Sequence, residues 1–296
     1  MFKRNVEEFF RNLQSDICKK LEKADGLGKF STDTWKREEG GGGISCVIKD
    51  GNIIEKGGVM FSAVEGKLPE KIQKGLNLPE TDFFATGVSI IMHPKNPHVP
   101  IIHMNTRYFE TSAGINWFGG GIDLTPHYVE EDDAKYFHTK IKETCDKHDK
   151  NYYAEFKKWA DNYFYIKHRN ETRGIGGIFF DRLSENNDFT IEDRFNFVQD
   201  IGKLFVPIYT HFMENNYKKT FSEKEKNWQL LRRGRYVEFN LIYDAGTKFG
   251  LETNGRIESI LVSMPPFSSW EYNFLPEKNS KEEKTLNLLK KDINWA

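Results

Sequence analysis

The chain has 296 residues, of which 38% are hydrophobic and 14% aromatic, and this composition excludes intrinsic disorder for the bulk of the protein. Its 43 basic and 44 acidic residues are mixed along the chain and give a formal net charge of −1, which excludes the basic stripe that nucleic-acid binding requires. No apolar run approaches the roughly 20 residues that span a bilayer, so we expect no membrane span.

The cysteines and the first residues bear on the cellular compartment. Cys18, Cys46 and Cys145 are far apart and odd in number, so they form neither a disulfide framework nor a Cys-x-x-Cys motif, and they favour a reducing compartment. The early acidic residues Glu7 and Glu8 argue against a transit peptide. We therefore expect a cytoplasmic protein.

The first predicted elements are a helix and a hairpin. Apolar residues recur at helical spacing over residues 6–21, and Gly26 helps to end this helix. The runs 44–48 and 57–61 are rich in β-forming residues and flank the turn signal Asp50-Gly51-Asn52. The pattern predicts an antiparallel strand pair.

A second strand pair and three helices follow. Residues 83–93 and 101–109 read as strands, because the prolines and the asparagine between them favour a turn. Helical apolar stripes extend over residues 132–168, with a break near Asn151, and over residues 191–216, with an expected kink at Pro207.

The C-terminal part is predicted to return to strands at residues 235–243 and 256–264, before a last helix at residues 284–291. Strand pairs are adjacent in the sequence rather than alternating with helices, which favours an antiparallel sheet. We predict an α+β fold in which residues 1–296 form a single domain, since no linker or repeat divides them.

One predicted strand carries polar side chains on one face. The period of two places His103, Asn105 and Arg107 together, and an in-register hairpin would bring Ser89 and His93 beside them. A base, a cation and hydrogen-bond donors would then converge. The alternative is the solvated face of a half-exposed sheet.

A glycine-rich run, Trp117-Phe-Gly-Gly-Gly-Ile-Asp-Leu-Thr-Pro, follows this strand. Its three glycines allow a close approach of the backbone, and Asp123 could accept hydrogen bonds from N–H donors. The alternative is a glycine turn with Asp123 as a cap. Glycines at 40–43 and 174–177 match neither a P-loop nor a dinucleotide fingerprint, so neither ATP nor nicotinamide is implied.

Four histidines lie on or beside predicted elements: His93, His103, His138 and His168. A metal site can be drawn from them, but their spacing is not diagnostic and no His-Glu-x-x-His motif is present. His138 and His168 lie on helical stripes, where a hydrogen-bonded interior histidine is the commoner explanation.

Several long motifs, in order, resemble the oxygen-dependent coproporphyrinogen III oxidases, and the resemblance extends almost from end to end. They begin at Ser89, His103, Trp117, Lys167 and Arg233, and read Ser-Ile-Ile-Met-His-Pro, His-Met-Asn-Thr-Arg-Tyr-Phe, Trp-Phe-Gly-Gly-Gly-Ile-Asp, Lys-His-Arg-Asn-Glu-Thr-Arg-Gly-Ile-Gly-Gly and Arg-Gly-Arg-Tyr-Val-Glu-Phe-Asn.

The resemblance implies a homodimer of single-domain subunits, each with a large antiparallel sheet that has helices on both faces and a deep substrate cleft. It implies O₂-dependent conversion of coproporphyrinogen III to protoporphyrinogen IX, in which two propionates become vinyl groups. No organic cofactor is implied, whereas some members are described with a divalent metal. We hypothesise that a base deprotonates a pyrrole N–H and that the electron-rich ring then reacts directly with O₂.

The resemblance also implies roles for single residues. His103 is similar to the catalytic proton donor, Asp123 to the carboxylate that holds the pyrrole N–H groups, and Arg107 to a residue of the catalytic and substrate-binding sets. The implied substrate-binding residues are Ser89, Asn105, Thr106, Arg107, Asn254, Gly255 and Arg256, and the implied metal ligands are His93, His103, His138 and His168. Arg107 and Arg256 suit bidentate binding of propionates.

The chain departs from the family pattern at Ala245 and Ser269, where many members have arginine. Two other functions therefore remain open. The first is a non-catalytic tetrapyrrole-binding protein, which would bind without O₂ uptake. The second is a histidine-site metallohydrolase, whose hydrolysis would be sensitive to chelators.

Overall fold

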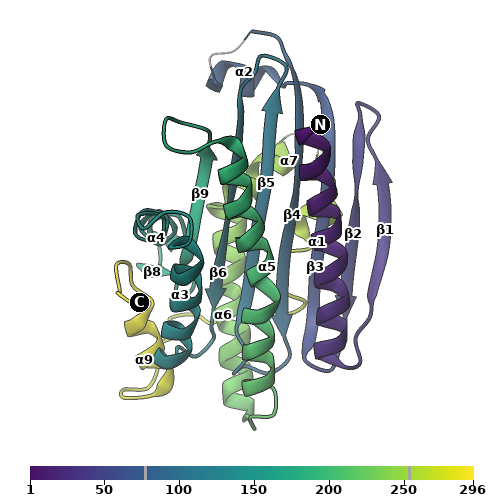
Figure 1. Cartoon of the computed structure of the whole chain (residues 1–296). Coiled ribbons are helices and arrows are strands. Elements are labelled where there is room, and N and C mark those ends of the chain that lie inside the picture. Colours follow the sequence, from purple (N-terminus) through teal and green to yellow (C-terminus); the bar gives the residue numbers. More distant parts are fainter. Residues whose placement is uncertain (77–78, 253–254) are drawn as a thin grey trace.

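The computed structural model describes residues 1–76, 79–252 and 255–296 and centres on one antiparallel sheet of seven strands (Figure 1). The strands follow in the order β1 (Phe30–Lys36), β2 (Gly41–Lys49), β3 (Ile54–Lys67), β4 (Asp82–Pro94), β5 (Ile101–Thr111), β6 (Asn116–Thr125) and β9 (Gly177–Leu183). Each pair of neighbours is antiparallel. The predicted hairpins and the α+β class are confirmed.

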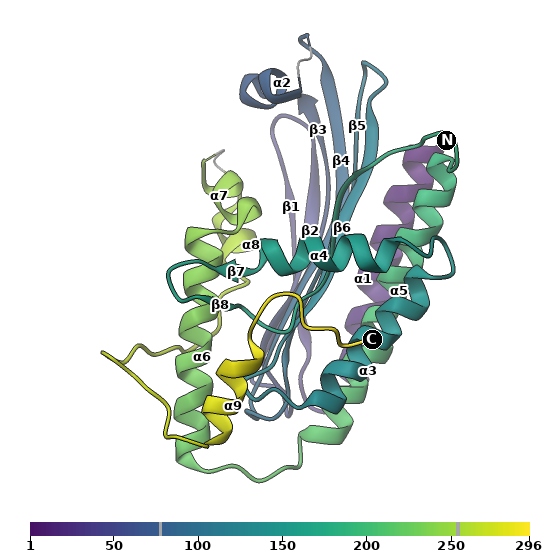
Figure 2. The same ribbon diagram turned by 90° about the vertical axis from the view of Figure 1, so that its left-hand side faces the viewer.

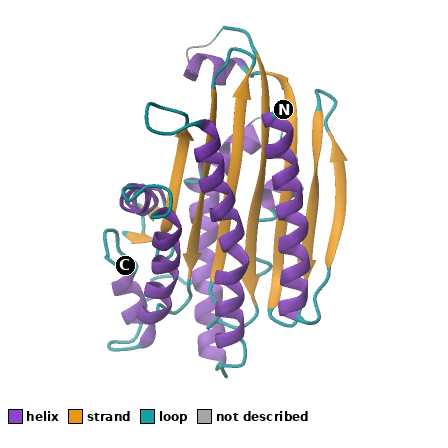
Figure 3. Cartoon of the chain, in the orientation of Figure 1, coloured by secondary structure: helices purple, strands orange, loops and turns teal. Residues whose placement is uncertain are grey.

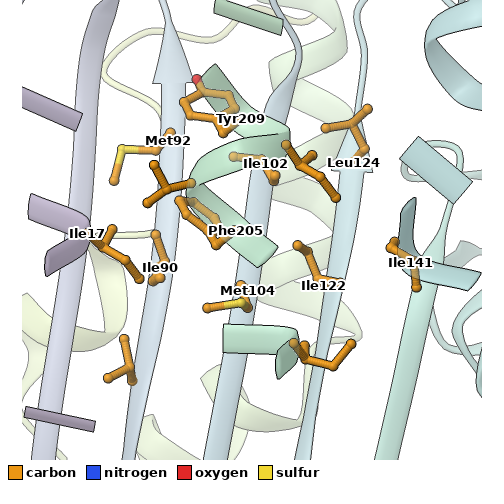
Figure 4. Packing of buried hydrophobic residues seen from close by; sticks show 14 of the residues in the cluster. Ile17, Ile90, Met92, Ile102, Met104, Ile122, Leu124, Ile141, Phe205 and Tyr209 are labelled. Atoms are coloured by element: carbon orange, nitrogen blue, oxygen red, sulfur yellow. The ribbon is translucent and has the colours of Figure 1, made fainter. Parts of the chain in front are cut away.

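One face of the sheet is covered by long helices (Figure 3). These are α1 (Phe2–Asp25) and α5 (Ile191–Asn216), beside which lie α3 (Glu131–Cys145) and α4 (Tyr152–Tyr163). The glycine predicted to end the first helix has a left-handed φ of 80°. Between helices and sheet lies the main core, where Ile17 and Phe205 face Ile90, Met92 and Met104 (Figure 4).

The opposite face is covered by helices that follow α5 in the chain (Figure 2). It carries α6 (Glu223–Ile242), α7 (Ala245–Glu252) and α8 (Ile257–Leu261). The predicted strands at 235–243 and 256–264 are therefore wrong. A capping box between Ser222 and Glu225 begins α6, and its buried residues Tyr236 and Phe239 are spaced three apart, which fits a helix as well as the local β propensity fits a strand.

Shorter elements complete the described chain. They are α2 (Glu70–Leu76), β7 (Tyr165–Ile166), β8 (Glu171–Thr172) and α9 (Lys281–Leu288), of which the last confirms the predicted final helix. Helix α5 continues through Pro207. Among the described residues, no helix is both long and apolar enough to cross a membrane.

The register of the central strands decides which side chains share a face. Ser89 pairs with Asn105, Ile91 with His103, and Gly87 with Arg107. Residues at even positions of β5, such as Ile102 and Met104, belong to the core beneath α1 and α5. Residues at odd positions therefore face the side covered by α6 to α8.

Candidate active site

A cavity of about 1200 Å³ occupies this second face of the sheet, between the strands and the α7–α8 segment. Five of the predicted site residues line it: Ser89, Asn105, Arg107, Gly255 and Arg256. Asn254 lies outside the described residues. The side chain of Thr106, which was also predicted to bind substrate, is fully buried on the core face because β5 alternates, so a contact with substrate would involve its backbone.

Arg107 stands at the centre of one cavity wall. Its Nη1 donates to Asn105 Oδ1 at 2.8 Å, and its Nη2 donates to Asp181 Oδ1 at 2.7 Å. The Arg107 side chain is 38% exposed, so its guanidinium remains accessible from the cavity. Asp181, on β9, was not predicted as a site residue, because only the pairing of β9 with β6 brings it to Arg107.

The glycine-rich run lies inside β6, so the alternative of a glycine turn is wrong. A Cβ at Gly119 would be 2.4 Å from Asp181 Oδ1 and 2.9 Å from Arg107 Nη2. A Cβ at Gly120, by contrast, would meet the carbonyl oxygen of Asn105 at 2.5 Å. Gly119 thus provides the space in which the Arg107–Asp181 ion pair lies against the sheet.

Below Arg107 on the same face, His103 and Asp123 face each other across β5 and β6. His103 Nδ1 is 2.8 Å from Asp123 Oδ1, and Arg173 Nη2 donates to Asp123 Oδ2. Burial disfavours the Asp123 carboxylate, but the charge of Arg173 and the hydrogen bond from His103 outweigh it and lower its pKa. His103 Nε2 has no hydrogen-bond partner among the described residues, and 27% of the side chain is exposed.

Arg173 is the buried counter-ion of this group, and sequence reasoning did not predict it. Its guanidinium lies 4.4 Å from the ring centroid of Phe164, 4.7 Å from Tyr236 and 4.8 Å from Phe239. Burial opposes its charge, but Asp123 raises its pKa above the ordinary arginine value. In the sequence it stands within the motif that begins at Lys167 and directly before a glycine-rich segment, but neither feature indicates what its side chain contacts.

Arg256 forms the other basic side of the cavity, as the residue that precedes α8. Its Nη1 donates to the hydroxyl oxygens of Ser45 and Ser259, each at 3.0 Å, and its Nη2 forms an ion pair with Asp33 on β1. The edge strand and the C-terminal segment therefore fix this guanidinium jointly. Sequence reasoning did not predict Asp33, Ser45 or Ser259.

The four histidines predicted as metal ligands do not come together, and no group of three or more ligand-type side chains forms a metal site within the described ranges. His93 is buried and contacts the carbonyl oxygen of Ser263, while His138 contacts Tyr153 Oη and the carbonyl oxygen of Ile175. His168 contacts Glu238 and Tyr243. Burial lowers the pKa of His138 to about 3. These residues do not fit one metal ion.

The two positions that depart from the family pattern lie away from the cavity lining. Ala245 begins α7, and its backbone N–H donates to Tyr163 Oη at 3.1 Å. The N–H of Ser269 donates to the carbonyl oxygen of Leu230 at 3.0 Å. Neither residue is among those that line the cavity.

Comparison with known proteins identifies the family. A family model described as coproporphyrinogen III oxidase matches residues 5–295. The oxygen-dependent coproporphyrinogen-III oxidase of Drosophila melanogaster is 49% identical, over 98% of this chain and 77% of the relative. The mitochondrial enzyme of Homo sapiens is 48% identical over 99% and 67%, and coproporphyrinogen-III oxidase 1, chloroplastic, of Arabidopsis thaliana is 47% identical over 98% and 78%.

Proposed function

We propose that this chain, which belongs to the coproporphyrinogen III oxidase family, oxidatively decarboxylates two propionates of coproporphyrinogen III with O₂ and releases protoporphyrinogen IX. The observation that carries the proposal is the charge of the 1200 Å³ cavity. Its lining has five basic side chains and two acidic ones. A substrate with four propionates is attracted to such a surface.

The apolar part of the same cavity suits the macrocycle. Phe109 stacks on Trp117 at 4.4 Å between ring centroids and on Phe83 at 6.1 Å, and all three rings line the cavity. Aromatic faces bind flat π-rich ligands by stacking. We infer that the pyrrole rings pack along these side chains while the propionates reach Arg107 and Arg256.

The electron balance defines what the residues must do. Each propionate loses CO₂ and becomes a vinyl group with release of two electrons and one proton, and O₂ takes up the two electrons and two protons as H₂O₂. Each turnover at one propionate therefore consumes one proton. We infer that His103 transfers protons through Nε2, because Asp123 engages its Nδ1 and sets its orientation.

The family resemblance gives Asp123 a second proposed role, as acceptor for the pyrrole N–H groups. Asp123 is buried and outside the cavity lining, so this role requires the ring to reach it beside His103. Since Arg173 keeps it ionised, the carboxylate is a strong hydrogen-bond acceptor. Orientation of the ring and exclusion of water are the contributions that we assign to the cavity. The histidine set does not fit a metal ion, so we assign no step to one.

The decisive experiment mixes chelator-treated protein with coproporphyrinogen III without oxygen, and then admits O₂ while uptake and product are followed. We expect protoporphyrinogen IX with two O₂ consumed for each substrate. Binding without O₂ uptake would instead favour a non-catalytic tetrapyrrole-binding protein. Turnover that appears only after a divalent cation is added would contradict our assignment of the histidines.

Arg107→Ala tests the site more directly. We expect it to remove most of kcat/KM, because Arg107 is the guanidinium at the centre of the sheet wall. A value near that of the unaltered protein would refute its role.

Association as a homodimer and a cytoplasmic location stay predictions. Light scattering of the purified protein would check the first, and cell fractionation would check the second.

A further inference from the structure

The end of β9 contains an irregularity at the cavity wall. Phe180 pairs with Gly120, whereas the next paired residues are Leu183 and Phe118, so Asp181 and Arg182 both stand opposite Gly119. Such a bulge breaks the alternation of side chains and redirects them. Accordingly, Asp181 and Arg182 both line the cavity, although neighbours in a regular strand would point to opposite faces.

The backbone of Arg182 has a φ of 51°, in the left-handed region. A residue with a Cβ rarely adopts this conformation, and it costs free energy of about 1 kcal/mol or more. Glycine would adopt it without strain. An arginine at this position therefore suggests that its side chain is used.

The charge of Arg182 is not neutralised within the described residues. The other cavity arginines have carboxylate partners, because Arg107 pairs with Asp181, Arg256 with Asp33 and Arg37 with Glu39. Arg182 has no ion pair or side-chain hydrogen bond in the part of the chain that the structure describes. Lys36 also lacks one there, but it lies in regular pairing with Gly42.

We propose that Arg182 binds one propionate of the substrate, so that β5 and β9 present two guanidiniums on either side of Asp181. The inference rests on the proposed function and deepens it. Gly87 and Gly119 both pair with Arg107, and neither carries a side chain on the cavity face. The Arg107–Asp181 ion pair occupies the space over Gly119, so the propionate that we assign to Arg182 approaches from the cavity side of this pair.

The test removes the charge while it keeps the backbone conformation. Asparagine tolerates the left-handed region, so Arg182→Asn isolates the guanidinium, and Arg182→Lys restores the charge. Arg182→Gly is a second charge-free variant that cannot strain the backbone. Arg4→Asn, an exposed change on α1 across the sheet from the cavity, is the matched control for net charge.

Two quantities are measured: KM for coproporphyrinogen III, and Kd for its oxidised porphyrin, a non-reacting tetracarboxylate whose fluorescence reports binding. We expect both constants to rise about tenfold in Arg182→Asn and Arg182→Gly, which corresponds to ~1.4 kcal/mol. Arg182→Lys should recover most of the loss, and Arg4→Asn should match the unaltered protein. The melting temperature should not fall.

Unchanged KM and Kd in both charge-free variants would overturn the inference. So would a loss in only one of the two charge-free variants, because a change of the backbone rather than the missing charge would then be responsible. Failure of the proposed function is distinguishable, since the unaltered protein would then show no O₂ uptake at all.

Discussion

Gly119→Ala separates the geometry of the site from the stability of the fold. The added methyl carbon would lie 2.4 Å from Asp181 Oδ1, about 1 Å closer than an ordinary contact. Asp181 and the Arg107 guanidinium, 2.9 Å from the same carbon, must therefore move. A displacement of about 1 Å in a substrate-positioning group costs about 100-fold in rate.

The stability of Gly119→Ala should hardly change. The side chains of Arg107 and Asp181 are 38% and 32% exposed, so solvent screens their ion pair. Loss of the pair therefore lowers the free energy of unfolding by only ~0.2–1 kcal/mol. Replacing a strand glycine by alanine returns a similar amount through lower backbone entropy in the unfolded chain. We expect an unfolding free energy within about 1 kcal/mol of the unaltered protein.

The matched control is Gly120→Ala, one residue further along β6. Its methyl group would point to the core face, 2.5 Å from the carbonyl oxygen of Asn105 and 3.0 Å from the ring of Phe180. Backbone in the middle of a sheet cannot withdraw, so we expect a loss of about 1–3 kcal/mol or more. This variant should lose stability first, whereas Gly119→Ala should lose activity first.

The assay pairs kcat/KM for coproporphyrinogen III with urea unfolding followed by tryptophan fluorescence. The reasoning fails if Gly119→Ala retains kcat/KM within twofold, or if the two alanine variants are equally destabilised. Asp181→Ala in the Gly119→Ala background removes the 2.4 Å contact. The loss of kcat/KM in the double variant, expressed as a free energy, should therefore not exceed the sum of the losses in the two single variants.

Three further predictions concern the buried polar groups. Asp123→Asn leaves Arg173 buried without its counter-ion, so we expect ~3–5 kcal/mol of destabilisation in urea; a loss below ~1 kcal/mol would refute the importance of the pair. Because the pKa of Asp123 is lowered in the fold, its stabilisation is present above the unfolded pKa and is lost as pH falls through the folded one, so Asp123→Asn should flatten the acid limb of the unfolding curve. His138, with a pKa of about 3, stays neutral in the folded protein but binds a proton in the unfolded chain below about pH 6.5. Its contribution to the free energy of unfolding therefore falls by ~1.4 kcal/mol for each pH unit of acidification below that value. The urea midpoints at pH 7 and pH 5 should differ less in His138→Gln than in the unaltered protein. Chelator-treated protein should keep its turnover rate when Zn²⁺ is added, because the four histidines are dispersed; stoichiometric zinc uptake with a rate increase would contradict this.

Local pattern predicted those elements of the fold whose apolar periods are unambiguous. The stripe over residues 191–216 matches α5 at both ends, and the hairpin 83–93 with 101–109 has the expected register. Residues 235–243 were misread, because their β propensity favoured a strand although the spacing of three between Tyr236 and Phe239 fits a helix. Their burial against Arg173 and the second face of the sheet favours the helix.

The candidate site divides in the same way. Period two within one strand placed His103, Asn105 and Arg107 on one face from the sequence alone, and the motif resemblance pointed to Asp123 and Arg256. The partners Asp33, Arg173 and Asp181 escaped prediction, because each meets its arginine or carboxylate only through pairing or packing of distant segments.

By itself, the sequence determined the class of the fold, the polar face of β5 and, through its motifs, the family to which the chain belongs. Only the tertiary structure decided which carboxylate holds each arginine, that Thr106 faces the core, that the four histidines stay apart, and that a bulge turns Arg182 into the cavity. The physical reason is range. Alternation and helical spacing act between neighbours, whereas these contacts join residues many tens of positions apart, and their geometry exists only once the sheet register and the helix packing are fixed.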